Sequence, residues 1–400
     1  YGGAGADTIY GGAGDDYLFG QDGVDTVSYS DATSGVTVDF ANDSATGGGG
    51  NDTLNTLENA EGSKYDDTFV SNLAVSNKFD GNDDESGEIN GDSISYAEVT
   101  VSDATEDKVV VNLSSGADGD GFFSADIYQG GSSSISDGLK NLENITGSNG
   151  NDTITADDDD NTIVGLDGDD LLAGKGGNDT LSGGAGSDTI TYEGLSTAVN
   201  VDLNSNTATG EGLDTLLSIE NVIGGSGSDT IKMGNGFVNT IDGGSGSESD
   251  TISYEFYTSG VNINLGTSLA QTIGVNDVDT ILNIENITGS SNADTILGSA
   301  GVNTIKAGLG NDTIIAALDT NNDGTLTSSD DGADYIDGGE GTGDWIDYSN
   351  IADDADANTD GIVVALNQEN EVDVTINGQA TDTILNVEHI KGTADSDIIT

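Results

Sequence analysis

The feature that most constrains how this chain can fold is a nine-residue period, which is clearest between residues 147 and 191. That stretch divides into five consecutive units in which the first and fourth places are mostly glycine. The eighth place of each unit is apolar, occupied in turn by Ile154, Ile163, Leu172, Leu181 and Ile190. The sixth place holds, in the same order, Asp152, Asn161, Asp170, Asp179 and Asp188. A fixed period of this kind indicates a repeat architecture, in which each unit contacts mainly its neighbours.

Each unit combines a glycine-rich turn with a very short strand. Glycine adopts positive φ at little steric cost, so the first six residues can turn sharply. The last three residues can form a short strand with one side chain pointing inward. One such strand buries almost nothing, whereas stacked units align their Ile and Leu side chains and give each strand partners above and below. The period therefore predicts an all-β fold, a parallel β-solenoid.

Stacking also brings the acidic turns together. Neighbouring coils of a parallel stack lie ~4.8 Å apart. Two bare carboxylates at that distance repel by roughly 3 kcal/mol at an effective dielectric constant of about 20. A hard cation that prefers oxygen ligands converts this repulsion into binding, and turn carbonyls can fill its remaining positions. The residues therefore predict multiple calcium ions in the stacked turns.

Several units match a known repeat almost letter for letter. Units such as 2–10 (GGAGADTIY) and 183–191 (GGAGSDTIT) resemble the nonapeptide of the repeats-in-toxin (RTX) family, G-G-x-G-x-D-x-U-x. The tandem copies in nine-residue phase make the resemblance specific. It implies a parallel β-roll with calcium between stacked turns, bound by Asp carboxylates and backbone carbonyls. It also implies export by a type I system and folding outside the cell.

The tandem units alternate with a longer pattern. The nonapeptide arrays lie at 2–28, 147–191, 224–253, 289–315 and 332–347. The longer pattern runs from Asp-x-apolar-x-Tyr through an alternating strand and a polar loop to Asp-Thr-Leu/Ile, a Glu-Asn-Ile segment and a final Asp-Thr-Ile. Its copies, which we call the long repeats, span 25–70, 92–154, 188–231, 250–296 and 344–399. Because each begins and ends on a nonapeptide-like Asp-x-apolar, we interpret them as longer coils that interrupt one continuous solenoid over 1–400. The alternative is a series of small β-sandwiches between rolls.

Two polar positions recur in the long repeats. The tyrosine that opens the pattern occurs as Tyr29, Tyr96, Tyr192, Tyr254 and Tyr348. The glutamate near its end occurs as Glu58, Glu143, Glu220, Glu285 and Glu388. This glutamate could bind calcium, cap a turn or face solvent, and the residues leave these alternatives open.

The sixth-place aspartates are the candidate calcium ligands, although an Asp in a turn can also simply cap its own backbone. The candidates are Asp7, Asp16, Asp25, Asp152, Asp170, Asp179, Asp188, Asp229, Asp250, Asp294, Asp312, Asp334, Asp344 and Asp397. Asn161, Asn239 and Asn303 stand where other units have Asp. Because an amide supplies one charge fewer, we expect these turns to bind calcium weakly or not at all.

A second calcium signature lies in the loop 319–330, DTNNDGTLTSSD. It matches the EF-hand loop at its first, third, fifth, sixth and seventh positions. The candidate ligands there are Asp319, Asn321, Asp323, Thr325 and Asp330. The final Asp in place of Glu resembles the loops of dockerin-like modules, and no clear amphipathic helix flanks the loop. We expect an isolated calcium loop, and the plainer interpretation is an acidic surface loop.

Composition excludes several functions. The chain has 73 acidic residues against 8 lysines, a formal charge of −65 and no Cys. Nucleic acid and anionic membrane surfaces are therefore implausible partners, since both are bound through cations. With one histidine, His389, and no Cys, the chain lacks the residues for a His-pair zinc site or a Cys/His nucleophile, so we expect no enzyme. The charge and low hydrophobicity approach those of disordered chains, and we expect disorder without calcium.

These observations favour a structural role. We expect an interior, calcium-stabilised segment of a large secreted bacterial surface protein, such as an adhesin, surface-layer or filament protein. Its partners would be calcium, further copies of itself or the cell surface and matrix, with no insertion into a membrane. The alternative is a calcium-binding export and folding module of a secreted RTX enzyme or toxin. An ice-binding face would need an unbroken outward row of threonines, which Leu171 interrupts.

Overall fold

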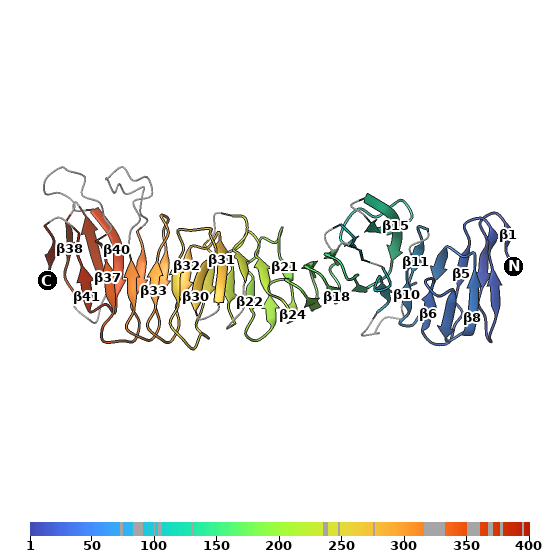
Figure 1. The fold of residues 1–400 in the computed structure, drawn as a ribbon, viewed down its shortest axis with the longest axis horizontal. Helices are drawn as coiled ribbons and strands as arrows, with labels where there is room; N and C mark the ends of the chain where they lie inside the picture. Colours follow the sequence, from blue (N-terminus) through green and yellow to red (C-terminus); the bar gives the residue numbers. More distant parts are fainter. Residues whose placement is uncertain are drawn as a thin grey trace. The chain divides into compact units, whose positions relative to one another are not determined.

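Strands are the only regular secondary structure in the described part of the chain (Figure 1). The computed structural model describes residues 1–72, 75–82, 91–99, 101–102, 106–129, 132–234, 239–246, 249–274, 277–315, 333–349, 361–366, 371–376, 379–393 and 396–400. Most strand pairs within these residues are parallel, which confirms the predicted all-β, parallel roll. Among the same residues there is no helix of the length and apolarity that a membrane crossing requires.

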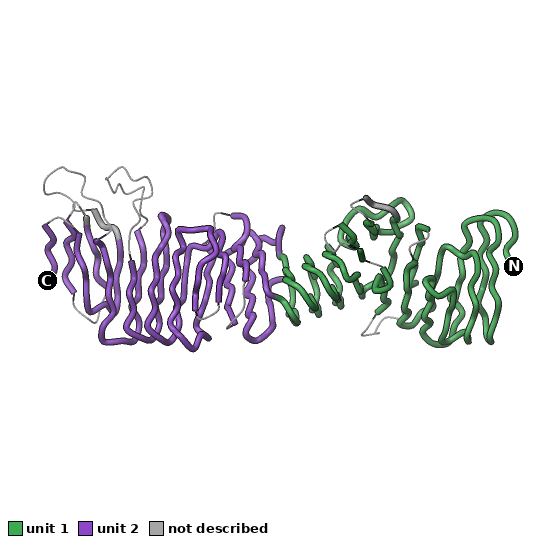
Figure 2. Tube along the Cα trace, viewed as in Figure 1, with its two compact units in different colours: residues 1–191, 211–219 green, residues 192–210, 220–400 purple. Residues whose placement is uncertain are grey.

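The chain divides into two compact units, coloured separately in Figure 2. Unit 1 comprises residues 1–191 and 211–219, and unit 2 comprises residues 192–210 and 220–400. Each unit is built from the same two kinds of element, the nonapeptide coil and the long repeat. The single continuous solenoid over 1–400 stays a prediction.

Two nonapeptides make one coil of the stack. In unit 1 one sheet contains β16 (Asn144–Thr146), β18 (Thr162–Asp167) and β20 (Thr180–Ala185), paired in parallel. A second sheet contains β17 (Thr153–Thr155), β19 (Leu171–Ala173) and β21 (Thr189–Thr191), also parallel. Ile154, Ile163 and Leu172 are fully buried, so both sheets direct their central residues inward. Successive units therefore alternate between the two sheets, and a turn stacks on the turn two units away.

The backbone conformation of the turn requires glycine at the fourth place. Gly168 and Gly177 adopt φ values of 130° and 100°. Side chains of L-residues rarely tolerate this region, so glycine is needed where the turn bends toward the strand.

The long repeats extend the sheets of the stack. In unit 1 β6 (Val36–Asp39), β7 (Ser44–Gly47) and β8 (Gly50–Asn55) pair antiparallel in sequence. The first of them also pairs in parallel with β10 (Thr68–Val70) of the following coil, and the third with β3 (Tyr17–Phe19) of the preceding coil. The long repeat thus forms three antiparallel strands, of which the first pairs with the following coil and the third with the preceding coil. It is therefore part of the same sheet as its neighbours.

The next long repeat repeats this arrangement in the other sheet of unit 1. It contributes β13 (Lys108–Asn112), β14 (Phe123–Gln129) and β15 (Ser132–Lys140), paired antiparallel. Its outer strands pair in parallel with β17 and with β11 (Lys78–Asp80). In unit 2 the same order is found for β38 (Ile362–Val364), β39 (Val372–Ile376) and β40 (Gln379–Leu385).

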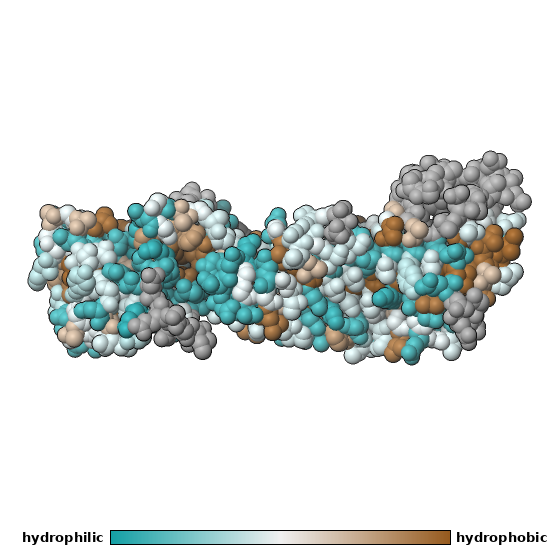
Figure 3. Space-filling view, turned by 180° about the vertical axis from the view of Figure 1, so that it is seen from behind, coloured by the Kyte–Doolittle hydropathy of each residue, from teal (hydrophilic) through white to brown (hydrophobic). Residues whose placement is uncertain are grey.

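The core of each unit is narrow and lined by one inward residue per short strand. The recurrent tyrosines Tyr29, Tyr96, Tyr254 and Tyr348 are among its largest fully buried side chains. The face shown in Figure 3 is mostly polar, with apolar residues in smaller groups. Buried aspartates lie beside this core in the turns.

Candidate metal centre

The sixth-place aspartates of the central array point inward and form a ladder. Asp152, Asp170 and Asp188 are each buried. Asp170 Oδ1 accepts a hydrogen bond from the backbone N–H of Asp152 at 2.8 Å. Asp188 Oδ1 accepts one from the N–H of Asp170 at 2.9 Å. We call such a series, in which each carboxylate accepts the N–H of the stacked turn before it, a carboxylate column.

In several turns of these columns the second carboxylate oxygen has no hydrogen-bond donor, whereas Oδ2 of Asp152, Asp229 and Asp294 accepts a backbone N–H of its own turn. Asp170 Oδ2 and Asp179 Oδ2 are buried and without a partner. The same holds, among the described residues, for the Oδ2 atoms of Asp7, Asp25, Asp312 and Asp344. A buried anion without compensation is costly by several kcal/mol. The turns with an unpartnered Oδ2 therefore require a positive charge beside this atom.

The first-place glycines form a cradle around this oxygen. A Cβ atom added to Gly165 would lie 2.0 Å from Asp170 Oδ2 and 2.6 Å from the carbonyl oxygen of Gly183. A Cβ on Gly174 would lie 2.1 Å from Asp179 Oδ2. A carboxylate oxygen and a backbone carbonyl oxygen thus converge on a space that only glycine leaves open. Carboxylate and carbonyl oxygens are the ligands that calcium prefers, so the residues fit this ion.

The columns spread the charge along the stack. Among the described residues no group of three or more Asp, Glu, His or Cys side chains gathers at one point. A calcium ion here would therefore take one or two carboxylates and complete its shell with turn carbonyls.

Burial also perturbs the titration of these carboxylates. It raises the pKa of Asp170 to about 7, and the neighbouring charges of Asp152 and Asp188 act in the same direction. Burial raises the pKa of Asp179 to about 7 as well. Metal-free, such groups hold a proton at a pH at which an ordinary Asp is ionised, so protons and calcium compete for the same oxygens.

Comparison with known families agrees with this chemistry. The model of the RTX calcium-binding nonapeptide repeat matches residues 1–29, 39–60, 143–172, 164–194 and 285–322. The chain carries RTX repeats that bind calcium. No curated protein matches the chain. The first, third and fourth RTX matches cover the turns of Asp7, Asp152 and Asp170, and the last covers those of Asp294 and Asp312.

The structure places most of the predicted RTX ligands in columns. In unit 1 the N–H of Asp7 donates to Asp25 Oδ1 at 2.8 Å. In unit 2 the N–H of Asp229 donates to Asp250 Oδ1 at 2.7 Å. A longer column there joins Asp294 to Asp312 and Asp312 to Asp344, each at 2.8 Å. The roles of these residues as ligands stay predictions.

Three other predicted ligands lie in different surroundings. The N–H of Asp334 donates to Asp382 Oδ1 at 3.2 Å, and Asp397 Oδ1 accepts the N–H of Ile362 at 3.0 Å. Asp16 is only half-buried, and its N–H donates to Asp52 Oδ1 at 2.9 Å. The loop 319–330, with Asp319, Asn321, Asp323, Thr325 and Asp330, lies outside the described residues.

The asparagine turns have a specific partner. Asn161 Nδ2 donates to the backbone carbonyl of Glu143 at 2.9 Å, and Asn303 Nδ2 donates to that of Glu285 at 2.7 Å. Asn239 Nδ2 donates to the carbonyl of Glu220. An amide can therefore satisfy a carbonyl that would otherwise need a cation. Asn77, which sequence reasoning missed, donates to the Glu58 carbonyl at 2.7 Å, and its spacing of 19 residues from Glu58 is the signal that could have found it.

The recurrent glutamates cap the columns. The Oε2 atom of Glu58 accepts the N–H of Asp25 at 2.8 Å, and that of Glu285 accepts the N–H of Asp250 at 2.9 Å. Glu143 and Glu388 do the same for Asp92 and Asp344, at 2.7 and 3.0 Å. Of the three interpretations left open by the residues, the structure supports the cap.

Sequence reasoning also missed two buried carboxylates of one column in unit 1. The N–H of Asp67 donates to Asp92 Oδ1 at 2.6 Å, and both residues are buried. A Cβ on Gly62 would lie 2.2 Å from Asp67 Oδ2, as at the first place of an RTX turn. Asp67 belongs to the closing Asp-Thr of the long repeat 25–70, and Asp92 opens the long repeat 92–154, so the long-repeat pattern is the signal that could have found both.

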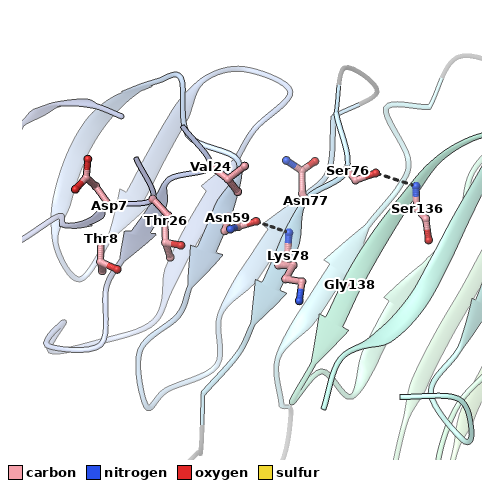
Figure 4. A pocket seen from close by; sticks show the side chains of 11 residues that line it. Asp7, Thr8, Val24, Thr26, Asn59, Ser76, Asn77, Lys78, Ser136 and Gly138 are labelled. Carbon is pink, nitrogen blue, oxygen red and sulfur yellow. Dashed lines mark hydrogen bonds between the residues drawn. The ribbon is translucent and has the colours of Figure 1, made fainter. Parts of the chain in front are cut away.

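A shallow groove also lies on the outer face of unit 1 (Figure 4). It has a volume of ≈ 450 Å³ and follows an outward row across five strands, from Thr8 through Thr26 and Asn59 to Lys78 and Gly138. Asn59 Oδ1 accepts the N–H of Lys78 at 3.0 Å. Asp7 and Lys78 are the charged residues that line this groove.

The cradle makes a direct prediction about Gly165. We expect Gly165→Ala to weaken calcium binding and to lower the free energy of unfolding by about 1–3 kcal/mol, because the new methyl group overlaps Asp170 Oδ2. Calorimetric calcium titration measures the loss of binding, and thermal unfolding in saturating calcium measures the loss of stability. Gly119→Ala is the matched control, since a Cβ there meets nothing within 4 Å. Equal behaviour of the two variants would contradict the cradle.

Proposed function

We propose that this segment is a calcium-stabilised structural element of a secreted bacterial surface protein, such as an adhesin, surface layer or filament. The observation that carries the proposal is the set of buried carboxylates, such as Asp170 and Asp179, whose Oδ2 atoms have no donor. These groups make the folded state depend on a divalent cation. Calcium is abundant outside cells, so the segment would fold after export and stay unfolded during it.

The coupling of calcium binding to folding can be large enough to decide whether the chain folds. A ligand that binds only the folded state stabilises it by about 1.4 kcal/mol per site when its concentration is tenfold above the dissociation constant. Extracellular calcium modules have dissociation constants of about 10⁻⁴ to 10⁻³ M. Sites in this range would be filled outside the cell and empty inside it, which makes folding follow the calcium gradient.

The segment itself is proposed to be non-catalytic and to act through repetition. Stacked coils with polar outer faces suit a stalk or lattice element, and further copies of the chain or the cell surface and matrix are its proposed partners. A catalytic domain in the sequence that adjoins this segment would instead favour the export and folding module of an RTX enzyme.

The test measures the free calcium concentration at which the chain folds. The circular dichroism of the 400-residue chain is followed against buffered free calcium, and sedimentation velocity at each point reports self-association. We expect a folding midpoint of about 10⁻⁴ to 10⁻³ M, with assembly only above it. Protease treatment of intact source cells should then cleave the segment. A midpoint below about 10⁻⁶ M, within the range of intracellular sensors, would contradict folding outside the cell.

A further inference from the structure

The long repeats contain buried carboxylates of their own. Each lies within the third strand of a long repeat, and all are buried: Asp52 in β8, Asp137 in β15, Asp279 in β31 (Asp277–Leu282) and Asp382 in β40. Each continues a column through Oδ1. Asp52 Oδ1 accepts the N–H of Asp16 at 2.9 Å, and Asp137 Oδ1 accepts that of Asn77 at 2.8 Å. On this side they are equivalent to the aspartates of the RTX turns.

Their second oxygen differs, because it has a hydroxyl donor. Tyr29 Oη donates to Asp52 Oδ2 at 2.7 Å, and Tyr348 Oη donates to Asp382 Oδ2 at 2.7 Å. Asp279 Oδ2 accepts Tyr254 Oη at 3.0 Å, and Asp137 Oδ2 accepts Ser71 Oγ at 2.6 Å. The atom that is left without a partner in Asp170 is therefore satisfied in each of these four.

The ring of Tyr29 also takes the space that a carboxylate occupies in neighbouring turns. At Gly2 and Gly20 an added Cβ would meet the carboxylates of their own units, at 2.8 Å from Asp7 Oδ2 and 2.5 Å from Asp25 Oδ2. At Gly11, which lies between them in sequence, it would meet the Tyr29 ring at 2.1 Å. Asp16, the sixth residue of the Gly11 unit, is half-buried as Asp7 is, so what distinguishes the Gly11 unit is the group that lies beside its first-place glycine.

We propose that the long repeats close their carboxylate turns with a side-chain hydroxyl in place of calcium. The unit at residues 11–19 then holds no calcium at Asp16, although it lies within a region that matches the RTX repeat. The hydroxyl is a permanent donor: burial, the hydrogen bond to Asp52 and its charge raise the pKa of Tyr29 far above its usual range.

This arrangement assigns different roles to the two kinds of element. RTX turns with an unpartnered Oδ2, such as that of Asp170, would gain a positive charge only when calcium is present, whereas the hydroxyl-closed turns are complete without it. The turns that end at Asp52, Asp137, Asp279 and Asp382 are thus metal-independent positions between the calcium-dependent turns. The inference concerns how individual turns are stabilised, so it does not rest on the cellular location in the proposed function.

The test compares bound calcium and stability in the full chain. Equilibrium dialysis with metal analysis counts calcium in the wild type and in Asp16→Asn, Asp52→Asn and Asp170→Asn. We expect Asp170→Asn to lose bound calcium, and Asp16→Asn and Asp52→Asn to keep the wild-type count. Loss of calcium in either of the latter two variants would overturn the proposal.

The hydroxyl is tested separately. Tyr29→Phe should lower the thermal midpoint by about 5 °C, because it leaves a buried carboxylate without its donor. Tyr10→Phe is the matched control, since that tyrosine is 61% exposed, and it should leave the midpoint unchanged. Equal effects of the two variants would also overturn the proposal. A wild-type chain that bound no calcium would overturn the proposed function alone, because the comparison of Tyr29 with Tyr10 is made at fixed metal content.

Discussion

In a calcium chelator the chain is expected to lose its β-sheet circular dichroism signal, and to regain it when calcium is restored. The formal charge of −65 opposes compaction, and the buried Oδ2 atoms of Asp170, Asp179 and their equivalents have no hydrogen-bond donor among the described residues. Each filled site contributes about 1.4 kcal/mol at calcium tenfold above its dissociation constant. Several sites together match the whole net stability of a typical domain, about 5–15 kcal/mol.

The control for this experiment is magnesium at equal ionic strength. Magnesium screens the surface charges equally well, but it demands octahedral geometry at about 2.0–2.1 Å and releases its water reluctantly. We therefore expect magnesium to restore little of the signal. A chain that keeps its full β signal in chelator at low salt would show that calcium is not what stabilises the columns.

The second large effect is a dependence of calcium binding on pH. Burial raises the pKa of Asp170 and Asp179 to about 7, from an ordinary value of 3.8. Between these values the metal-free folded chain holds protons that the unfolded chain has released. Without calcium the free energy of unfolding therefore falls as pH rises from about 4 to about 7. Calcium must displace the same protons, so its binding strengthens over the same interval.

Calorimetric calcium titrations at pH 5, 6, 7 and 8, made under conditions in which the metal-free chain shows a β-sheet circular dichroism signal, test this prediction. For a site that releases one proton, the apparent affinity should fall about tenfold per pH unit below about 7 and level off above it. Asp170→Asn removes one titrating group and should flatten the dependence. Affinities that do not change between pH 5 and 8 would contradict a competition between protons and calcium.

Much of the repeat unit could be predicted from local sequence. Glycines such as Gly168 and Gly177 have positive φ, and the apolar residues such as Ile154 and Leu172 are buried, as the nine-residue period requires. The calcium chemistry also followed from the period, because stacking repeated acids necessarily brings like charges close together. Turn conformation and the alternation of buried residues depend on neighbours a few positions away. Both can therefore be predicted from one sequence without knowledge of the tertiary structure.

What the sequence by itself determined is therefore the unit: a glycine turn, a short strand and an acid that needs calcium. The tertiary structure alone decided how each acid is satisfied. Asp170 accepts the N–H of Asp152 from 18 residues away, and Asp52 accepts the Tyr29 hydroxyl from 23 residues away. Both acids follow similar polar turns in the sequence. Only the stacking of coils, which depends on packing over tens of residues, places a hydroxyl beside one carboxylate and leaves the other to a metal ion.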